Sequence, residues 1–177
     1  TQRLIEGLGT IEGITVRGSE LFELTWQTNV ALVYDKATFT PKRQYKYSGE
    51  GWGLTNDGKQ IYMSDGTAQI RVWDPATLNE IRRITVTDGT RQIAALNELE
   101  WVKGEIWANI WQTDRIARID PKTGKVNSYL DLKGILGVMD SMGTDVLNGI
   151  AYDAKTDRIW VTGKLWPKIF EVRLVSK

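Results

Sequence analysis

A fourfold internal repeat limits what this chain of 177 residues can fold into more than any other feature of its sequence. Each repeat opens on a short segment with one central aliphatic residue, followed by a turn rich in Gly, Asp, Asn or Lys. The four aliphatic residues, at successive spacings of 40, 45 and 51 residues, are Ile14, Leu54, Leu99 and Ile150. Units of about 40 to 50 residues made of short strands are typical of β-propeller blades. The repeat therefore predicts an all-β propeller of four-stranded blades.

Alternating apolar stretches punctuated by Gly, Pro and Asp predict β-hairpins rather than helices within each repeat. Second strands are expected at 21–26, 60–64, 106–111 and 159–162, and third strands at 31–35, 70–74, 116–120 and 168–172. A fourth strand is expected in three repeats, at 42–47, 80–86 and 126–130. A short helix is allowed only at 134–141.

The predicted blades cover residues 10–49, 50–94, 95–146 and 147–177 of a single domain. The fourth repeat runs out after its third strand, and residues 1–9 are expected to supply the missing outer strand. This pattern agrees with two arrangements. The four blades form a closed ring by themselves, or they are four blades of a larger ring.

The charge pattern and the residue types that are absent exclude several function classes. The 23 basic and 22 acidic residues nearly cancel and form no basic stripe, so neither nucleic acid nor a membrane surface is an expected partner. No apolar run approaches the roughly 20 residues of a membrane span. The absence of Cys and His excludes disulfides, thiol nucleophiles, Ser-His-Asp catalysis and ordinary zinc sites. Acid–base chemistry must therefore use carboxylates, Lys, Tyr or water. Separately, we expect the protein to be a monomer.

One edge of the predicted propeller gathers the chemically interesting residues. The first strand of a blade lines the channel, and its start lies beside the end of the second strand because the two are antiparallel. The residues placed at this channel mouth are Glu12, Trp26, Trp52, Asn97, Trp111, Asn148 and Lys164. Aromatic walls with a few convergent polar groups are typical of a pocket for a small molecule or a peptide end.

Structural roles are the alternative interpretation of these residues. Glu12 is then a solvated loop carboxylate, Lys164 an exposed charge, and Asn97 and Asn148 hold turns through side chain to backbone hydrogen bonds. Core packing is expected for the tryptophans inside strands, which are Trp73, Trp101, Trp107 and Trp160. Turn formation is expected for the repeated Asp35, Asp74 and Asp120.

Several long stretches resemble the plant and bacterial type of glutaminyl cyclase, a five-bladed propeller family. They include Gly49-Glu50-Gly51-Trp52-Gly53-Leu54, Leu96-Asn97-Glu98-Leu99-Glu100, 108–119, 145–151 and 162–168, in order over nearly the whole chain. The family's further N-terminal blade, with its Phe-Thr-Gln-Gly or Phe-Thr-Glu-Gly motif, has no counterpart among these residues.

The resemblance implies conversion of an N-terminal Gln of a peptide or protein into pyroglutamate, with release of ammonia. It implies that Glu12 is the catalytic carboxylate. Asn97 and Lys164 are expected to bind the amide oxygen or the developing oxyanion. Trp26, Trp52, Trp111 and Asn148 are expected to bind the substrate. No cofactor is expected to be required, a structural calcium ion is left open, and a periplasmic or secreted location is implied.

Two other functions remain open at this point. Glu12, Asn97 and Asn148 around one channel resemble the oxygen-ligand calcium cage of lactonase-like propellers, which implies a metal-dependent hydrolase. A non-catalytic propeller that binds a peptide or a partner is the third hypothesis.

Overall fold

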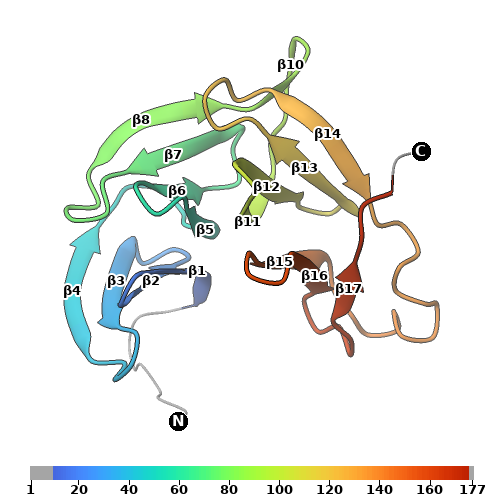
Figure 1. The fold of residues 1–177 in the computed structure, drawn as a ribbon, viewed down its shortest axis with the longest axis horizontal. Helices are drawn as coiled ribbons and strands as arrows, with labels where there is room; N and C mark the ends of the chain where they lie inside the picture. Colours follow the sequence, from blue (N-terminus) through green and yellow to red (C-terminus); the bar gives the residue numbers. More distant parts are fainter. Residues whose placement is uncertain (1–9, 176–177) are drawn as a thin grey trace.

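The computed structural model describes residues 10–175, which contain seventeen strands and no helix. Four antiparallel sheets follow one another along the chain and lie along an arc in Figure 1, each with its first strand toward the centre. We call these sheets blades 1 to 4. The predicted all-β propeller of four-stranded blades is thereby confirmed. No helix in the described range is long and apolar enough to cross a membrane.

The strands follow chain order within every blade. Blade 1 contains β1 (Ile11–Arg17), β2 (Glu20–Thr25), β3 (Val30–Asp35) and β4 (Pro41–Lys46). Blade 2 contains β5 (Gly53–Asn56), β6 (Ile61–Ser64), β7 (Gln69–Trp73) and β8 (Glu80–Thr85). Blade 3 contains β11 (Leu96–Val102), β12 (Glu105–Ile110), β13 (Arg115–Ile119) and β14 (Val126–Asp131). Blade 4 contains β15 (Leu147–Asp153), β16 (Arg158–Gly163) and β17 (Phe170–Val172).

Two local features differ from the sequence-based expectations. A two-stranded hairpin of β9 (Thr87–Asp88) and β10 (Arg91–Gln92) joins blades 2 and 3 and was not predicted. Residues 134–141, where a short helix was allowed, form turns instead. The positive φ of 78° at Gly134 excludes that residue from a helix. The expected outer strand at residues 1–9 lies outside the described residues.

Repeated aspartates at the end of the third strand form the turns that lead into the fourth. Oδ1 of Asp35 accepts the backbone N–H groups of Ala37 and Thr38, each at 3.0 Å. Asp74 and Asp120 make the equivalent pairs of hydrogen bonds two and three residues along the chain. These hydrogen bonds hold the pKa of all three carboxyls below the ordinary value. The predicted turn role of the three aspartates is confirmed.

Most of the hydrophobic core lies between adjacent blades, and one smaller cluster belongs to blade 1 alone. Because side chains alternate along a strand, Phe22 and Leu24 of β2 face blade 2, where they cluster with Leu54 and Met63. Equivalent clusters join blade 2 to blade 3 and blade 3 to blade 4. Trp73 and Trp107 are buried in these clusters, as expected. Trp160 differs: it is only partly buried and lies under the guanidinium of Arg158.

The inner strands pack in the order β1 on β5, β5 on β11 and β11 on β15. Gly13 and Gly53 permit this close approach: a Cβ on Gly13 would lie 3.0 Å from the backbone of Gly53, and one on Gly53 would lie 2.9 Å from Cα of Glu98. Among residues 10–175, no comparable packing joins β15 back to β1, and Figure 1 shows the arc open between blades 1 and 4.

We expect Gly53→Ala to destabilise the protein by about 1–3 kcal/mol, because the new methyl group collides with the backbone of β11 and the blades must separate. Gly137→Ala is the matched control, since its added Cβ meets only the end of the Asp140 side chain at 3.7 Å. Urea unfolding of both variants measures the difference. Equal stability of the two would show that the inner strands separate without cost.

Candidate active site

The predicted mouth residues lie at one edge of the blades because of backbone pairing at the start of each inner strand. In three blades, the residue just after the second strand donates its N–H to the residue before the first strand. Trp26 donates to Thr10 at 2.7 Å, Trp111 to Ala95 at 2.8 Å and Lys164 to Val146 at 2.9 Å. Trp26, Trp111 and Lys164 therefore occupy corresponding positions, just after the second strand, in blades 1, 3 and 4.

Three inner strands carry a β-bulge at this same edge. The pairing register shifts between Ile11 and Ile14, between Leu96 and Leu99, and between Leu147 and Ile150. Within these bulges lie three of the four polar residues predicted for the site, Glu12, Asn97 and Asn148. A bulge re-aims side chains and is common next to active sites. The repeat thus places one polar residue at the same irregular position in three blades.

Glu12 and Lys164 meet each other across the open side of the arc. Nζ of Lys164 donates to Oε2 of Glu12 at 3.2 Å, although the two residues are 152 positions apart. The Glu12 side chain is 17% exposed and that of Lys164 is 38% exposed, so both are partly accessible. A carboxylate and an ammonium group therefore sit together where the first and last blades face one another.

Glu50, which the sequence analysis did not single out, organises the aromatic part of the mouth. One of its carboxylate oxygens, Oε2, accepts the indole N–H of Trp26 and that of Trp52, both at 2.8 Å. Trp52 in turn meets Trp111 edge-on, with ring centroids 5.5 Å apart and planes at 78°. The three predicted tryptophans are thus connected, and we call Trp26, Trp52, Trp111 and Glu50 the tryptophan cluster. The acidic position two residues before Trp52 was the sequence feature that could have revealed this role.

The two predicted asparagines have different surroundings. Asn148 accepts the backbone N–H of Glu98 through Oδ1 at 3.2 Å, a hydrogen bond between blades 3 and 4. Asn97 is buried, and its Oδ1 has no hydrogen-bond partner within the described residues. The neighbouring strand supplies another buried amide, Asn109, whose Oδ1 accepts the N–H of Gly149 at 3.1 Å while its Nδ2 has no partner in the described range. Asn97 therefore offers an unused acceptor.

Below the mouth, the inner strands of all four blades line an open central cavity of about 680 Å³. Glu98 and Glu100 of β11 both line it, together with Ile14, Thr55 and Ile150. Burial, and then the negative charges of Glu100 and Glu12, raises the pKa of Glu98 well above its usual range. Burial also raises the pKa of Glu100. The negative charge of Glu12 thus acts on a protonatable carboxyl farther along the channel.

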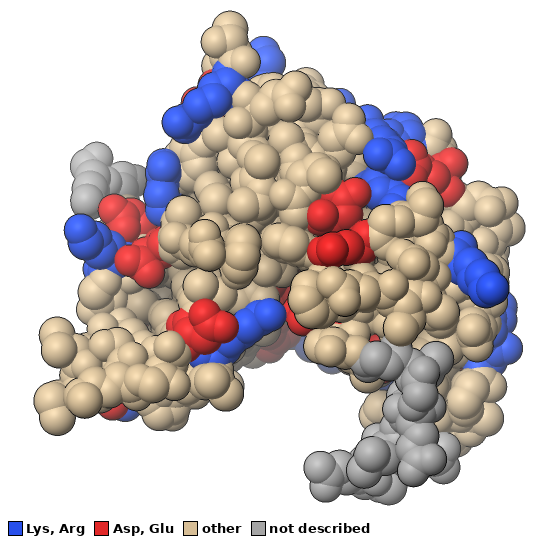
Figure 2. All heavy atoms as spheres, turned by 180° about the vertical axis from the view of Figure 1, so that it is seen from behind, with Lys and Arg blue, Asp and Glu red and all other residues tan. Residues whose placement is uncertain are grey.

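The face of the molecule shown in Figure 2 does not gather charge of one sign. Figure 2 shows, on the face opposite that of Figure 1, small groups of acidic and basic side chains separated by uncharged surface. Among residues 10–175, no group of three or more acidic side chains is arranged to hold a metal ion. The structural calcium ion therefore stays a prediction without a located site.

We expect Glu98→Gln to stabilise the protein near neutral pH. The Glu98 carboxyl is ionised in the unfolded chain at this pH, whereas burial in the folded protein disfavours the ionised form. Because the pKa of Glu98 is raised in the folded state, the contribution of its protonated carboxyl to stability is present in full below the usual pKa of 4.5. This contribution is lost as the pH rises through the pKa of the folded state. Urea unfolding of wild type and Glu98→Gln measures the difference in stability as a function of pH. The measurements cover about pH 4 to pH 8, the range in which raised carboxyl pKa values act. Glu20→Gln is the control of opposite sign, because Arg43 lowers the pKa of Glu20. Parallel pH profiles for wild type and Glu98→Gln would contradict the assignment.

We expect Glu50→Leu to disorder the tryptophan cluster, whereas Glu50→Gln preserves it, because an amide oxygen still accepts both indole N–H groups. Each lost hydrogen bond has a net value of about 0.5–1.5 kcal/mol. Near-ultraviolet circular dichroism reports the packing of Trp52 against Trp111 directly. A Glu50→Leu spectrum identical to that of wild type would show that the rings hold their orientation without the carboxylate.

Comparison with known proteins identifies the family. Residues 5–174 match the glutamine cyclotransferase family. The glutaminyl-peptide cyclotransferase of Arabidopsis thaliana is 41% identical over 167 residues, which are 92% of this chain and 52% of that protein. The chain thus spans about half the length of this relative.

Solved structures agree in fold. The crystal structure of Myxococcus xanthus glutaminyl cyclase superimposes with a TM-score of 0.87 at 35% identity, covering 94% of this chain and 74% of that one. The computationally designed Ika4 protein, with a TM-score of 0.56 and 14% identity over 98% of this chain and 96% of its own, shares the fold alone. From the family match over residues 5–174 and the identity to the plant relative, the chain belongs to the glutamine cyclotransferase family.

Proposed function

We propose that this chain converts an N-terminal glutamine of peptides into pyroglutamate and releases ammonia. The observation that carries the proposal is the ion pair of Glu12 and Lys164 at the channel mouth, at 3.2 Å, on the same edge of the blades as the tryptophan cluster. Membership of the glutamine cyclotransferase family supports the same reaction.

The reaction needs no nucleophile from the protein, which suits a chain without Cys or His. The α-amine nitrogen of the glutamine forms a bond to its own side-chain amide carbon. The amine loses a proton, the bond from that carbon to the amide nitrogen breaks, and the nitrogen leaves as ammonia after gaining a proton. The protein must hold the bent substrate, move the proton and stabilise the transient oxyanion.

Glu12 moves the proton in this proposal. As a carboxylate it accepts a proton from the attacking amine and then delivers it to the leaving nitrogen, so the site returns to its starting state. Lys164, 3.2 Å away, balances the charge of Glu12 before the reaction. When Glu12 is protonated, the Lys164 ammonium is free to donate to the developing oxyanion.

The remaining mouth residues bind and orient the substrate. The unpaired Oδ1 of Asn97 accepts a substrate N–H, which removes the cost of about 1–3 kcal/mol that an unsatisfied buried acceptor carries. The tryptophan cluster supplies apolar faces that fold the aliphatic part of the glutamine side chain. Asn148 acts indirectly, by holding the backbone of Glu98 beside Asn97.

We expect Glu12→Gln to lower kcat by about 10²–10⁴-fold, the usual contribution of a general acid–base group, with little change in fold. Ammonia release from a Gln-initiated dipeptide measures turnover, and circular dichroism checks the fold. Glu171→Gln is the matched control, because Glu171 lies on β17 and pairs with Arg158 of the neighbouring strand β16. Turnover near the wild-type value in Glu12→Gln would exclude Glu12 as the proton carrier.

The same assay separates the two alternative functions. Tight binding of Gln-peptides by the wild-type chain without ammonia release would favour a propeller that only binds. Loss of ammonia release on adding a chelator would favour a metal-dependent reaction, whereas the proposed chemistry predicts no effect of the chelator.

A further inference from the structure

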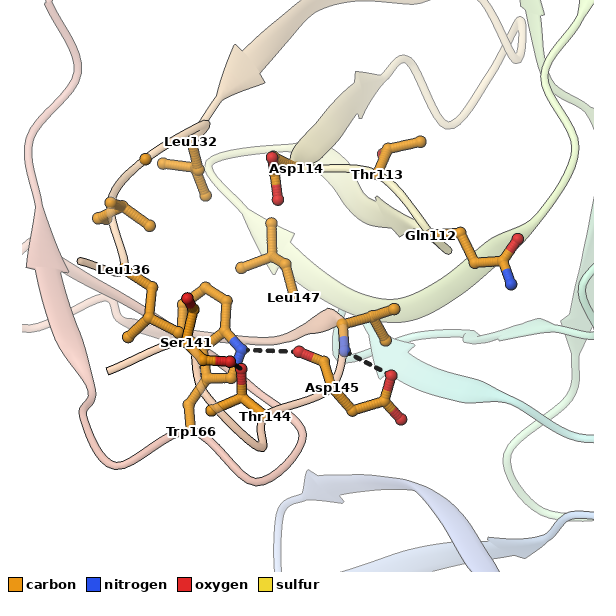
Figure 3. Close-up of a pocket in the computed structure, with 13 residues that line it drawn as sticks. Gln112, Thr113, Asp114, Leu132, Leu136, Ser141, Thr144, Asp145, Leu147 and Trp166 are labelled. Atoms are coloured by element: carbon orange, nitrogen blue, oxygen red, sulfur yellow. Dashed lines mark hydrogen bonds between the residues drawn. The ribbon is translucent and has the colours of Figure 1, made fainter. Parts of the chain in front are cut away.

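A second cavity, of about 440 Å³, opens between blades 3 and 4 and has no role in the reaction described above. It is shown in Figure 3. Its walls come from the turn after β12, the long loop between β14 and β15, and the residues after β16. We call it the side pocket. The lining residues used below are Gln112, Asp114, Leu132, Leu136, Asp145, Leu147 and Trp166.

The side pocket adjoins the proposed active site through the chain itself. Gln112 directly follows Trp111, and Leu147 directly precedes Asn148. Asp145, also in the wall, donates its backbone N–H to the carbonyl oxygen of Lys164 at 2.9 Å. Three mouth residues are thus covalent or hydrogen-bonded neighbours of the pocket wall, so the side pocket lies at the same edge of blades 3 and 4 as these mouth residues.

One part of the side pocket wall is apolar. Leu132, Leu136 and Leu147 surround it together with the indole of Trp166. Trp166 is fixed by a hydrogen bond from its Nε1 to the carbonyl oxygen of Asp145 at 2.9 Å. These side chains offer contact to a long aliphatic chain.

The charged groups in the side pocket are all negative. Asp114 and Asp145 line it, and no Lys or Arg is among its lining residues. Oδ1 of Asp145 accepts the N–H of Val146 at 2.8 Å, so its carboxylate has a structural role. The carboxylate of Asp114 has no hydrogen bond or ion pair within residues 10–175, and Figure 3 shows it pointing toward Leu147.

We propose that the side pocket binds the second residue of the substrate peptide and favours lysine or arginine there; this rests on the proposed cyclisation of N-terminal glutamine. The aliphatic stem of such a side chain packs against Leu132, Leu136 and Trp166, and its cationic end pairs with Asp114. A glutamate at the same position meets Asp114 and Asp145 with a like charge and is disfavoured.

The test compares four tripeptide amides: Gln-Lys-Ala, Gln-Ala-Ala, Gln-Glu-Ala and Gln-Ala-Lys. For each, kcat/KM for ammonia release and the dissociation constant from titration calorimetry are measured at low salt. We expect Gln-Lys-Ala to be the best substrate and the tightest ligand. In Asp114→Asn, its advantage over Gln-Ala-Ala falls by about three- to fivefold, the size expected of a partly exposed ion pair.

Asp88→Asn is the matched control, with the same charge change on the β9–β10 hairpin, where the new amide still accepts the hydroxyl of Tyr129. It leaves the peptide preference unchanged. Equal values for Gln-Lys-Ala and Gln-Glu-Ala, a preference that survives Asp114→Asn, or a stronger preference for Gln-Ala-Lys overturns the assignment. Absence of ammonia release from all four peptides overturns the proposed reaction instead, and the dissociation constants still decide the pocket.

Discussion

The close approach of the inner strands is the constraint on which the rest of this protein depends. At Gly13 and Gly53 the backbone of one blade lies against the backbone of the next, and a single Cβ would separate them. Because the blades meet so closely, their flat faces bury the apolar side chains of the second and third strands between them. That burial is the main source of stability in such a fold. The same approach brings the starts of the inner strands, and hence all the polar mouth residues, around one axis.

The site is built from interactions between blades rather than within them. Glu12 of blade 1 meets Lys164 after blade 4, and Asn148 of blade 4 holds the backbone of Glu98 in blade 3. Glu50 lies between blades 1 and 2 and holds an indole from each side. A rotation of one blade against its neighbour would therefore change the distances in the site directly. This arrangement makes the stability of the blade interfaces a condition for the proposed chemistry.

Several polar groups whose burial costs free energy lie on the first two strands of blade 3. Burial raises the pKa of Glu98 and Glu100, and Asn97 and Asn109 each have one amide atom without a partner in the described range. Such groups lower stability in a protein that only has to fold. Asn97, Glu98 and Glu100 share the inner strand of blade 3, which is consistent with polar atoms kept available for a ligand. The turn aspartates, in contrast, have their carboxylates satisfied locally, as Asp35 does.

The sequence by itself determined the blades, their strands, the turn aspartates and the edge at which Glu12, Trp26 and Trp111 lie. These features follow from alternation and antiparallel pairing inside units of about 50 residues, which are local and repeat along the chain. Only the tertiary structure decided that Glu12 pairs with Lys164, that one carboxylate oxygen of Glu50 binds two indoles, and that a side pocket opens beside the mouth. Each of these depends on how separate blades are placed and on which rotamer a side chain adopts, and neither is encoded in a local pattern of residues.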